Sequence, residues 1–301
     1  FEVEVFPNSE ELIVEADEVI AFSGNTGSSG GPHLHFEIRD NQERPMNPML
    51  FGITAKDTTT PSVLGVFAYP KDENATINGK NERVPLRLIP QNNGDFMVEK
   101  VTALGNIGFG VSTHDRLDGA PNKNGVSNIQ TFYNGNKSLE IDFKRFSFDE
   151  SKHIKRLIDY KYYKTKKTRI QKLFVEPNNP LSLYKDAYDK GYIMVEDSTS
   201  SVYKIRILDF NQNEAWITIP IEGKKDVLTK PKKEDLSNKT LIYSDKPTTL
   251  NSGNITVNFY ANTVYDDVYV DYKVSSDTLY LHEDTIPLQK NYYINYNFRN
   301  Y

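Results

Sequence analysis

The stretch SVYKIRILDFNQNEAWITIPIEG, Ser201 to Gly223, decides the fold class of this chain. In residues 201–210 and 214–223, large apolar side chains recur at every second position. This alternation is typical of β-strands that bury one face. The three polar residues between the runs, 211–213, have the length of a hairpin connection. The sequence therefore predicts an antiparallel pair of strands.

Similar short runs continue outward from this hairpin in both directions. The chain is rich in Tyr and Phe (19 and 16 residues), which favour strands, and Asn, Asp and Gly interrupt it at the intervals expected of turns. Upstream runs are SVLGVFAY (62–69), RVPLRLIP (83–90), GNIGFGVSTHD (105–115), IQTFYNG (129–135) and KSLEIDFKRF (137–146). Downstream runs are NITVNFYA (254–261), DDVYVDYKV (266–274), DTLYLHED (277–284) and NYYINYNF (291–298). We expect a mainly β protein.

Composition divides the chain into four segments. Residues 1–55 carry three predicted strands (1–6, 18–24 and 33–39) and form the first, and residues 56–223 form an immunoglobulin-like β-sandwich. Residues 224–238 are charged, nearly free of large apolar side chains, and are predicted to be a linker. Residues 239–301 supply only about four strands and predict a partial second β-sandwich.

One segment of the sandwich has a different periodicity. In FDESKHIKRLIDYKYY, Asp149 is a candidate N-cap, and Ile154, Leu157 and Ile158 form an apolar stripe. We therefore expect a helical insertion over about 149–190.

Global composition excludes some classes of function. The net charge of −5 does not indicate a nucleic-acid-binding protein. The absence of Cys excludes disulfides, thiolate zinc sites and cysteine nucleophiles. No apolar run approaches the roughly 18 residues of a membrane span, so we expect no transmembrane segment.

The stretch SGNTGSSGGPHLHFEIRD, Ser23 to Asp40, carries the strongest candidate for chemistry. On an extended strand, His33 and His35 would point to the same side, roughly 6.5–7 Å apart, while Leu34 points into the core. One imidazole could bind a metal and the other handle the proton of a metal-bound water. An H-x-H pair alone is weak support, because such pairs also occur on ordinary surfaces.

The whole string, GNTGSSGGPHLHFEIR, resembles the C-terminal motif of LytM/lysostaphin-type zinc metalloendopeptidases, and includes Pro32 and Leu34, which a generic metal site does not require. The resemblance implies a peptidase β-sheet domain, of which this chain holds the C-terminal part, a zinc cofactor and cleavage of peptide cross-links in peptidoglycan. By position it implies that His35 is a zinc ligand and His33 the catalytic histidine. It also implies that Asn25, Thr26 and Gly27 contact substrate.

The match is incomplete in one respect. The family's other zinc ligands, a His and an Asp, precede the H-x-H motif, and no His lies among the 32 residues before His33. His114, His153 and His282 lie far downstream and are expected to be ordinary surface or turn histidines. A single imidazole does not hold zinc in a catalytic geometry, so we expect this chain to be inactive by itself. The parent is expected in the periplasm or cell envelope, exported through a signal not present in this chain.

A second function from a different class stays open. The protein could be a non-catalytic scaffold or subunit of an envelope complex that uses a peptidase-like fold and Ig-like domains to bind other proteins. Residues 57–301 carry no predicted catalytic group. An H-x(3–8)-D motif upstream would favour the enzyme.

Residues 152–172 contain nine Lys or Arg and a single acidic residue, Asp159. They predict either a solvated helix and loop or a patch that docks an anionic partner. The candidate patch residues are Lys155, Arg156, Lys164, Lys166, Lys167 and Arg169.

Two acidic stretches are weaker candidates for ligand sites. DRLDGAPNKNG, Asp115 to Gly125, alternates carboxylates with Gly and Asn, but its spacing is not that of an EF-hand and it lacks the terminal Glu. We expect a structural turn there. Asp266, Asp267 and Asp271 are expected to point outward from a strand, with sugar or calcium binding as the alternative.

Overall fold

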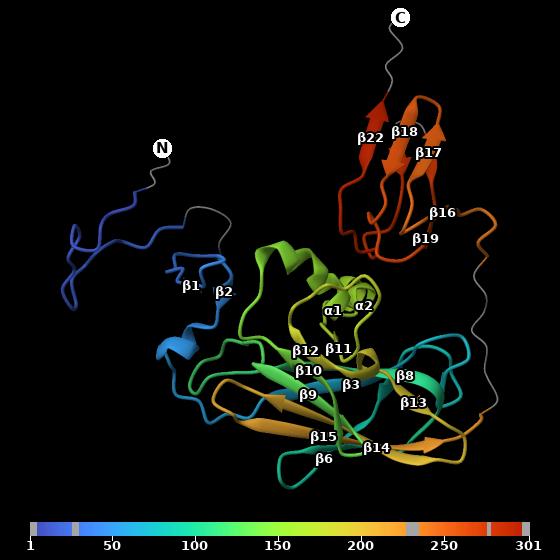
Figure 1. Ribbon diagram of the computed structural model, residues 1–301, viewed down its shortest axis with the longest axis horizontal. Helices are drawn as coiled ribbons and strands as arrows, with labels where there is room; N and C mark the ends of the chain where they lie inside the picture. The colour runs from blue at the N-terminus through green and yellow to red at the C-terminus, as the bar shows by residue number, and fades with distance from the viewer. Residues whose placement is uncertain (1–4, 26–29, 227–234, 276–277, 297–301) are drawn as a thin grey trace, which may run out of the picture. The chain divides into compact units, whose positions relative to one another are not determined.

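The computed structural model describes residues 5–25, 30–226, 235–275 and 278–296 (Figure 1). The chain divides into two compact units, Phe1–Ile38 and Arg39–Tyr301. The fold is mainly β, which confirms the predicted fold class. Among the described residues, no helix has the length and apolar character needed to cross a membrane.

The described residues of the first unit form turns and irregular segments in place of the predicted strands. The predicted strand over 18–24 is absent, and of the one over 33–39 only β1 (Ile38–Arg39) is formed. The predicted strand over 1–6 lies largely outside the described residues. A strand is stable only when a neighbour pairs with its backbone and covers its apolar face. Leu34 and Phe36 are 86% and 56% exposed, so the prediction that Leu34 lies in a core is wrong.

The second unit begins with β2 (Pro45–Met46) and a short 3-10 helix, Pro48–Phe51, and is then built around one continuous set of paired strands. Pairing follows the order β12-β10-β9-β14-β15-β8-β3-β5, and β15 runs parallel to β8 while the other neighbours are antiparallel. The strands of the order are β3 (Ser62–Pro70), β5 (Val84–Leu86), β8 (Val101–His114), β9 (Asn128–Tyr133), β10 (Asn136–Asp142), β12 (Tyr184–Ala187), β14 (Ser200–Leu208) and β15 (Glu214–Gly223). Short strands at the sides are β4 (Thr76–Ile77), β6 (Leu88–Pro90), β7 (Phe96–Val98), β11 (Gln171–Lys172) and β13 (Ile193–Val195).

The hairpin predicted from the sequence is confirmed. β14 and β15 pair antiparallel from Ser200↔Glu222 to Leu208↔Glu214. Their alternating apolar side chains are buried, as the period of two requires. These are Tyr203, Ile205, Ile207, Ala215, Ile217, Ile219 and Ile221.

β8 joins two parts of this strand set because it turns a corner at Gly105. Residues 101–103 pair with β15, whereas residues 107–114 pair with β3. Gly105 has a φ of +80°, and a Cβ there would lie 3.1 Å from the Cα of Ala75. Glycine reaches this backbone conformation without a steric penalty. The bend curls the strands around a single hydrophobic core, in which Phe109 and Tyr203 stack with ring centroids 4.3 Å apart.

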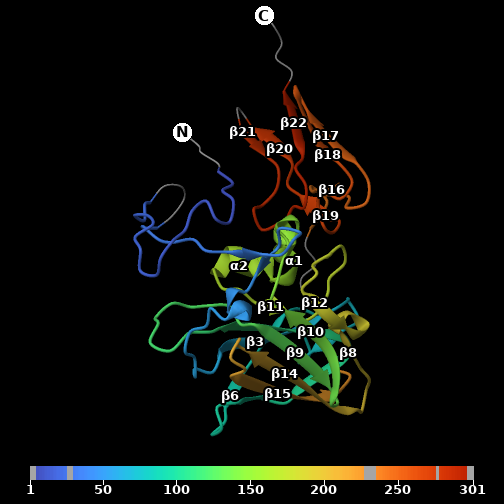
Figure 2. The ribbon, with the colours of Figure 1, turned by 60° about the vertical axis from the view of Figure 1, so that its left-hand side comes forward.

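The helical insertion consists of a 3-10 turn (Phe148–His153), α1 (Ile154–Leu157) and α2 (Tyr160–Lys166). Both views show α1 and α2 beside β11 (Figures 1 and 2). The predicted apolar stripe is confirmed, with Leu157 and Ile158 buried and Ile154 packed against the core. The predicted cap is wrong, since Asp149 lies inside the 3-10 turn.

The side chain that caps a helix here is that of Asp159. It accepts a hydrogen bond of 3.0 Å from the backbone N–H of Tyr162 at the start of α2.

The C-terminal strands have a small core of their own. Val257, Phe259 and Val264 are nearly inaccessible to solvent and pack together in this core. The predicted linker lies partly outside the described residues. The strands are β16 (Thr240–Ile242), β17 (Thr248–Ser252), β18 (Ile255–Phe259), β19 (Val268–Val270), β20 (Lys273–Ser275), β21 (Thr278–Tyr280) and β22 (Tyr293–Tyr296).

Candidate functional site

His33 and His35 lie in an irregular, exposed segment of the first unit. Nδ1 of His33 lies 2.9 Å from the carbonyl oxygen of Gly31. Because a carbonyl only accepts hydrogen bonds, Nδ1 carries the proton and donates it. The lone pair of the neutral imidazole is then on Nε2. His33 is therefore held in the tautomer whose Nε2 can take up a proton.

His35 is oriented by a carboxylate. Its Nε2 lies 2.7 Å from Oε1 of Glu37, which is less exposed than the imidazole. Since the carboxylate accepts, Nε2 donates, and the neutral ring offers its lone pair at Nδ1. Histidines that bind metals commonly donate their other ring N–H to a carboxylate in this way. His35 thus has the donor chemistry predicted for a metal ligand.

The described residues around this pair do not complete a catalytic zinc site. Such a site normally uses three protein ligands. Across residues 5–25, 30–226, 235–275 and 278–296, neither His33 nor His35 belongs to a group of three metal-binding side chains. These residues alone therefore do not fit a catalytic zinc ion. Asn25 is described and exposed, whereas Thr26 and Gly27 lie outside the described residues.

The predicted basic patch is only partly exposed. Lys166, Lys167 and Arg169 are exposed, whereas Arg156 is only 6% exposed. Arg156 forms ion pairs with Glu176 and Asp266. Arg156 is therefore unlike the exposed partner-binding residue that was predicted, because its guanidinium is already paired with carboxylates of the same chain.

The other lysines of the patch also have partners within the chain. Lys164 pairs with Asp284 at 2.6 Å, and this contact raises the pKa of Lys164. The ammonium of Lys155 lies 3.5 Å from the carbonyl oxygen of Leu288. Both acceptors belong to the C-terminal segment of the second unit, residues 240–296. Part of the predicted patch is therefore covered by the chain's own residues.

One of the three downstream histidines, His153, does not lie on the surface. His153 is buried, and its Nδ1 lies 2.8 Å from the hydroxyl of Tyr265. The expectation that His153 is an ordinary surface residue is wrong, because the C-terminal segment covers it. His114 ends β8, and burial, together with the charges of Lys123 and Arg116, lowers its pKa.

A cluster of three buried carboxylates could not be recognised from the sequence. Oxygens of Asp57, Asp115 and Asp209 lie within 4.8 Å of one another. The three residues are far apart in the sequence, and only Asp115 lies in a stretch that the sequence marks as a candidate ligand loop. Strand order brings them together, and strand order is not visible in the spacing of residues.

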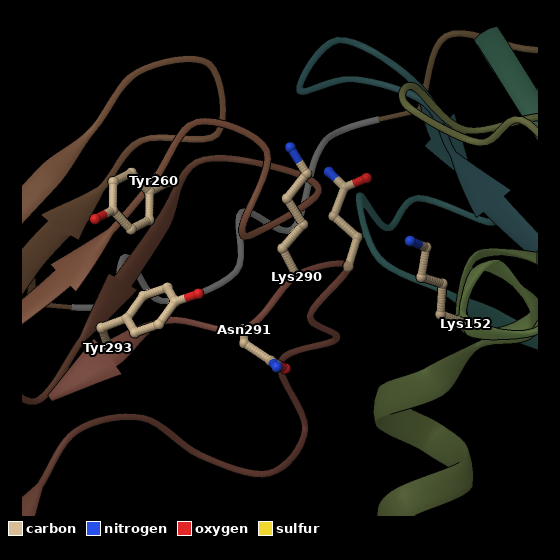
Figure 3. Close-up of a pocket in the computed structure, with 6 residues that line it drawn as sticks. Lys152, Tyr260, Lys290, Asn291 and Tyr293 are labelled. Atoms are coloured by element: carbon tan, nitrogen blue, oxygen red, sulfur yellow. The ribbon is translucent and has the colours of Figure 1, made fainter. Parts of the chain in front are cut away.

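A surface pocket in the second unit contains none of the predicted site residues. Figure 3 shows Lys152 facing Lys290 and Asn291, with Tyr260 and Tyr293 on the side of the C-terminal strands. Lys290 donates to the carbonyl oxygen of Ala261 at 3.4 Å. The pocket has no group of metal ligands among its described lining residues.

Comparison with known proteins addresses the histidine segment. Residues 6–48 match the profile of "Peptidase family M23". Proteins named DD-carboxypeptidase/endopeptidase Mpg, from Neisseria meningitidis serogroup B and Neisseria gonorrhoeae, are 33% identical over 75 residues. The matched region is 25% of this chain and 17% of each relative. No solved structure matches the chain significantly. The predicted resemblance is confirmed: the segment that holds His33 and His35 matches the model of peptidase family M23.

Proposed function

We propose that the protein containing this chain is a zinc endopeptidase of the bacterial cell envelope that cleaves peptide cross-links of peptidoglycan. The observation that supports this proposal is the match of residues 6–48 to peptidase family M23, which covers the whole GGPHLHFE string. The name of the Neisseria relatives, a carboxypeptidase and endopeptidase, agrees with peptide-bond cleavage.

In this proposal each residue of the histidine segment has a separate task. His35 contributes one ligand, and Glu37 fixes its tautomer through the 2.7 Å contact to Nε2. His33 holds or releases a proton at Nε2, because its Nδ1 is bound to the Gly31 carbonyl. When bound, zinc supplies Lewis acidity toward water and the substrate carbonyl. Asn25, Thr26 and Gly27 remain the predicted contacts to substrate.

The test uses the complete natural protein and two substitutions that separate the roles. His35→Ala is expected to lower the zinc content after dialysis and to abolish peptide release from purified sacculi. His33→Ala is expected to retain zinc but to lose about 10²–10⁴-fold in rate, the size of a general acid–base contribution. His282→Gln, in the C-terminal part, serves as the control and leaves both properties unchanged. A wild-type protein that binds no zinc and releases no peptides contradicts the proposal.

A non-catalytic scaffold is the second candidate. It is favoured by one observation, the extent of the second unit. Most of the chain, Arg39–Tyr301, is a β unit without a predicted catalytic group. The scaffold predicts that the complete protein co-purifies stoichiometrically with an envelope protein from solubilised membranes and that His35→Ala does not change this association. Recovery without a stable partner counts against it.

A further inference from the structure

Three buried aspartates meet at one end of the main strand set. Asp57 precedes β3, Asp115 directly follows β8, and Asp209 directly follows β14. Oxygens of the three carboxylates lie within 4.8 Å of one another. Because β3 and β8 are antiparallel, with Ser62 opposite His114, the start of one strand lies beside the end of the other. The topology therefore places Asp57 beside Asp115, and the side-chain amide of Asn213 joins Asp209 to Asp57.

The carboxylate of Asp115 lacks a partner for one oxygen. Asp115 is 5% exposed, and its Oδ1 is buried without any hydrogen bond. Buried polar atoms are nearly always paired, so an orphaned carboxylate oxygen calls for a ligand. Burial, together with the charges of Asp209 and Asp57, raises the pKa of Asp115 to about 6. The orphaned atom is thus part of a group with excess negative charge.

Among the described residues, no basic side chain pairs with this charge. Within the described part of the chain, none of the three aspartates forms a salt bridge. Asp209 instead accepts hydrogen bonds from Asn213, through its backbone N–H at 2.9 Å and its amide at 2.7 Å. Burying charges without a counter-ion is costly. A cation would remove that cost.

The three segments are fixed to one another by hydrogen bonds. The amide nitrogen of Asn213 also lies 3.2 Å from the carbonyl oxygen of Asp57. The backbone of Asp115 pairs in both directions with Asn124, at 2.9 and 2.8 Å. Asp118, in the same loop, accepts from the backbone N–H of Thr58 at 2.9 Å. The arrangement is therefore organised in advance of binding.

We propose that Asp57, Asp115 and Asp209 bind a calcium ion. The group offers only hard oxygen atoms, which suit Ca²⁺, and no sulfur or imidazole that would favour zinc. Calcium–oxygen distances of about 2.3–2.6 Å allow two ligand oxygens to lie up to about 5 Å apart, whereas the roughly 2.1 Å distances of Mg²⁺ allow only about 4.2 Å. The oxygens of the three aspartates, all within 4.8 Å of one another, satisfy the spacing that calcium allows. The site is separate from the histidine segment and is independent of its proposed activity.

The test measures metal content and thermal stability of the purified chain after removal of metals with EDTA. Adding about 5 mM CaCl₂, a concentration above the Kd of weak extracellular calcium sites, is expected to raise the midpoint of unfolding by roughly 5 °C. One Ca²⁺ per chain should remain bound in equilibrium dialysis. Asp115→Asn and Asp209→Asn should each lose the calcium-dependent rise.

The controls show whether the calcium response arises at these three aspartates. Asp245→Asn removes an exposed carboxylate outside the cluster and should keep the calcium-dependent rise. If Asp115→Asn fails to fold, two measurements still test the proposal: the number of Ca²⁺ ions bound per wild-type chain, and the calcium-dependent rise of the unfolding midpoint in Asp209→Asn. Absence of bound calcium in the wild type overturns the proposal, as does an equal response to Mg²⁺ or a calcium response that survives both substitutions.

Discussion

The guanidinium of Arg156 forms a bidentate contact with the carboxylate of Asp266: Nη2 donates to Oδ1 at 3.1 Å, and Nη1 donates to Oδ2. Nη2 also donates to the carbonyl oxygen of Pro177 at 3.1 Å. Arg156 belongs to α1 of the helical insertion, whereas Asp266 lies in the C-terminal segment, 110 residues away. Part of the basic segment 152–172 is therefore paired with the C-terminal part of the same chain.

Removing Arg156 should destabilise the fold more than removing an exposed lysine of the same segment. Arg156→Ala leaves the carboxylates of Glu176 and Asp266 with one cation fewer. Because Arg156 is buried but Asp266 is half exposed, we expect a loss of about 1–3 kcal/mol, between the values for exposed and buried pairs. The measurement is the free energy of unfolding in urea. Lys166→Ala, at an exposed position of α2, is the control and should change it by less than about 0.5 kcal/mol. Equal effects of the two substitutions would show that the Arg156 contacts contribute little.

The contact between His153 and Tyr265 should make stability depend on pH. Burial, with the charge of Lys152, lowers the pKa of His153, and Glu150 opposes the shift. The unfolded chain therefore binds a proton more readily than the folded one below about pH 6.5. Stability contributed by neutral His153 is present above that pH and is lost as the pH falls through the lowered pKa.

The difference in unfolding free energy between pH 7.5 and pH 5.5 should thus be smaller in His153→Gln than in the wild type. Urea titrations at the two pH values give the pH-dependent change in unfolding free energy for each protein. Subtracting the change in the variant from that in the wild type removes the contribution of the groups that both proteins share. An unchanged difference would mean that the Tyr265 contact accommodates the protonated imidazole.

The strands around the main core were predictable because each of them buries one face. The run Glu214–Gly223 matches β15 residue for residue, and the run 62–69 matches β3 except for its last residue. The predicted strand over 83–90 is divided into β5 and β6, since its pairing changes from β3 to β7 at Arg87. Alternation reports burial of a face but not which strand lies opposite.

The site was less predictable than the fold. The GGPHLHFE string identified the family segment, yet the same period of two wrongly predicted a strand through His33 and His35. Pairing partners, which decide whether an alternating run becomes a strand, are not encoded in the run itself. Asp57 and Asp209 could not be predicted for a related reason: each is a single Asp in a loop, and only the tertiary structure brings them to Asp115.

A methyl group at Gly108 should test the packing of β8 against the segment after β11. A Cβ at this position would lie 2.4 Å from Cδ1 of Phe174, a buried ring with little room to move. Gly108→Ala should lower the free energy of unfolding by about 1–3 kcal/mol, as overpacking of a core does. Gly125→Ala, where a Cβ meets no atom within 4 Å, should leave it within about 0.5 kcal/mol. Similar values for the two variants would contradict the close packing.

In calcium-free buffer, Asp115→Asn should stabilise the chain at neutral pH. The folded-state pKa of Asp115 is raised from 3.8 to about 6 by burial and by its acidic neighbours. Stability from the protonated carboxyl is present below about pH 4 and is lost as the pH rises through about 6. Asn keeps the shape without the charge, so at pH 7.5 with EDTA the variant should exceed the wild type by about 1 kcal/mol.

This advantage should shrink toward pH 4 and reverse when calcium is added. Asp118→Asn is expected to have the opposite sign, because hydrogen bonds from Thr58 and Thr59 lower the pKa of Asp118 and favour its charged form. Urea titrations of the three proteins at three pH values make the comparison. A destabilised Asp115→Asn variant in EDTA at neutral pH would show that the charged carboxylate is satisfied without a metal.

Glu37 should matter for metal binding although it is not expected to be a ligand. Its Oε1 accepts from Nε2 of His35 at 2.7 Å and so keeps the lone pair of the ring on Nδ1. Glu37→Gln, in the complete protein, presents an amide that can still accept a hydrogen bond but no longer carries the charge that strengthens the imidazole as a donor to metal. Loss of such an orienting carboxylate typically lowers metal affinity by about 10–100-fold.

The measurement for Glu37 is competition for zinc with a chelator of known affinity, alongside peptide release from sacculi at saturating zinc. A positioning role predicts weaker zinc binding with most of the activity recovered once zinc is in excess. A proton-transfer role predicts the reverse, with normal zinc affinity and a rate that zinc does not restore. Glu43→Gln, at an exposed glutamate six residues further along the chain, is the control and should change neither quantity. Because the two roles move different observables, the comparison assigns Glu37 to one of them.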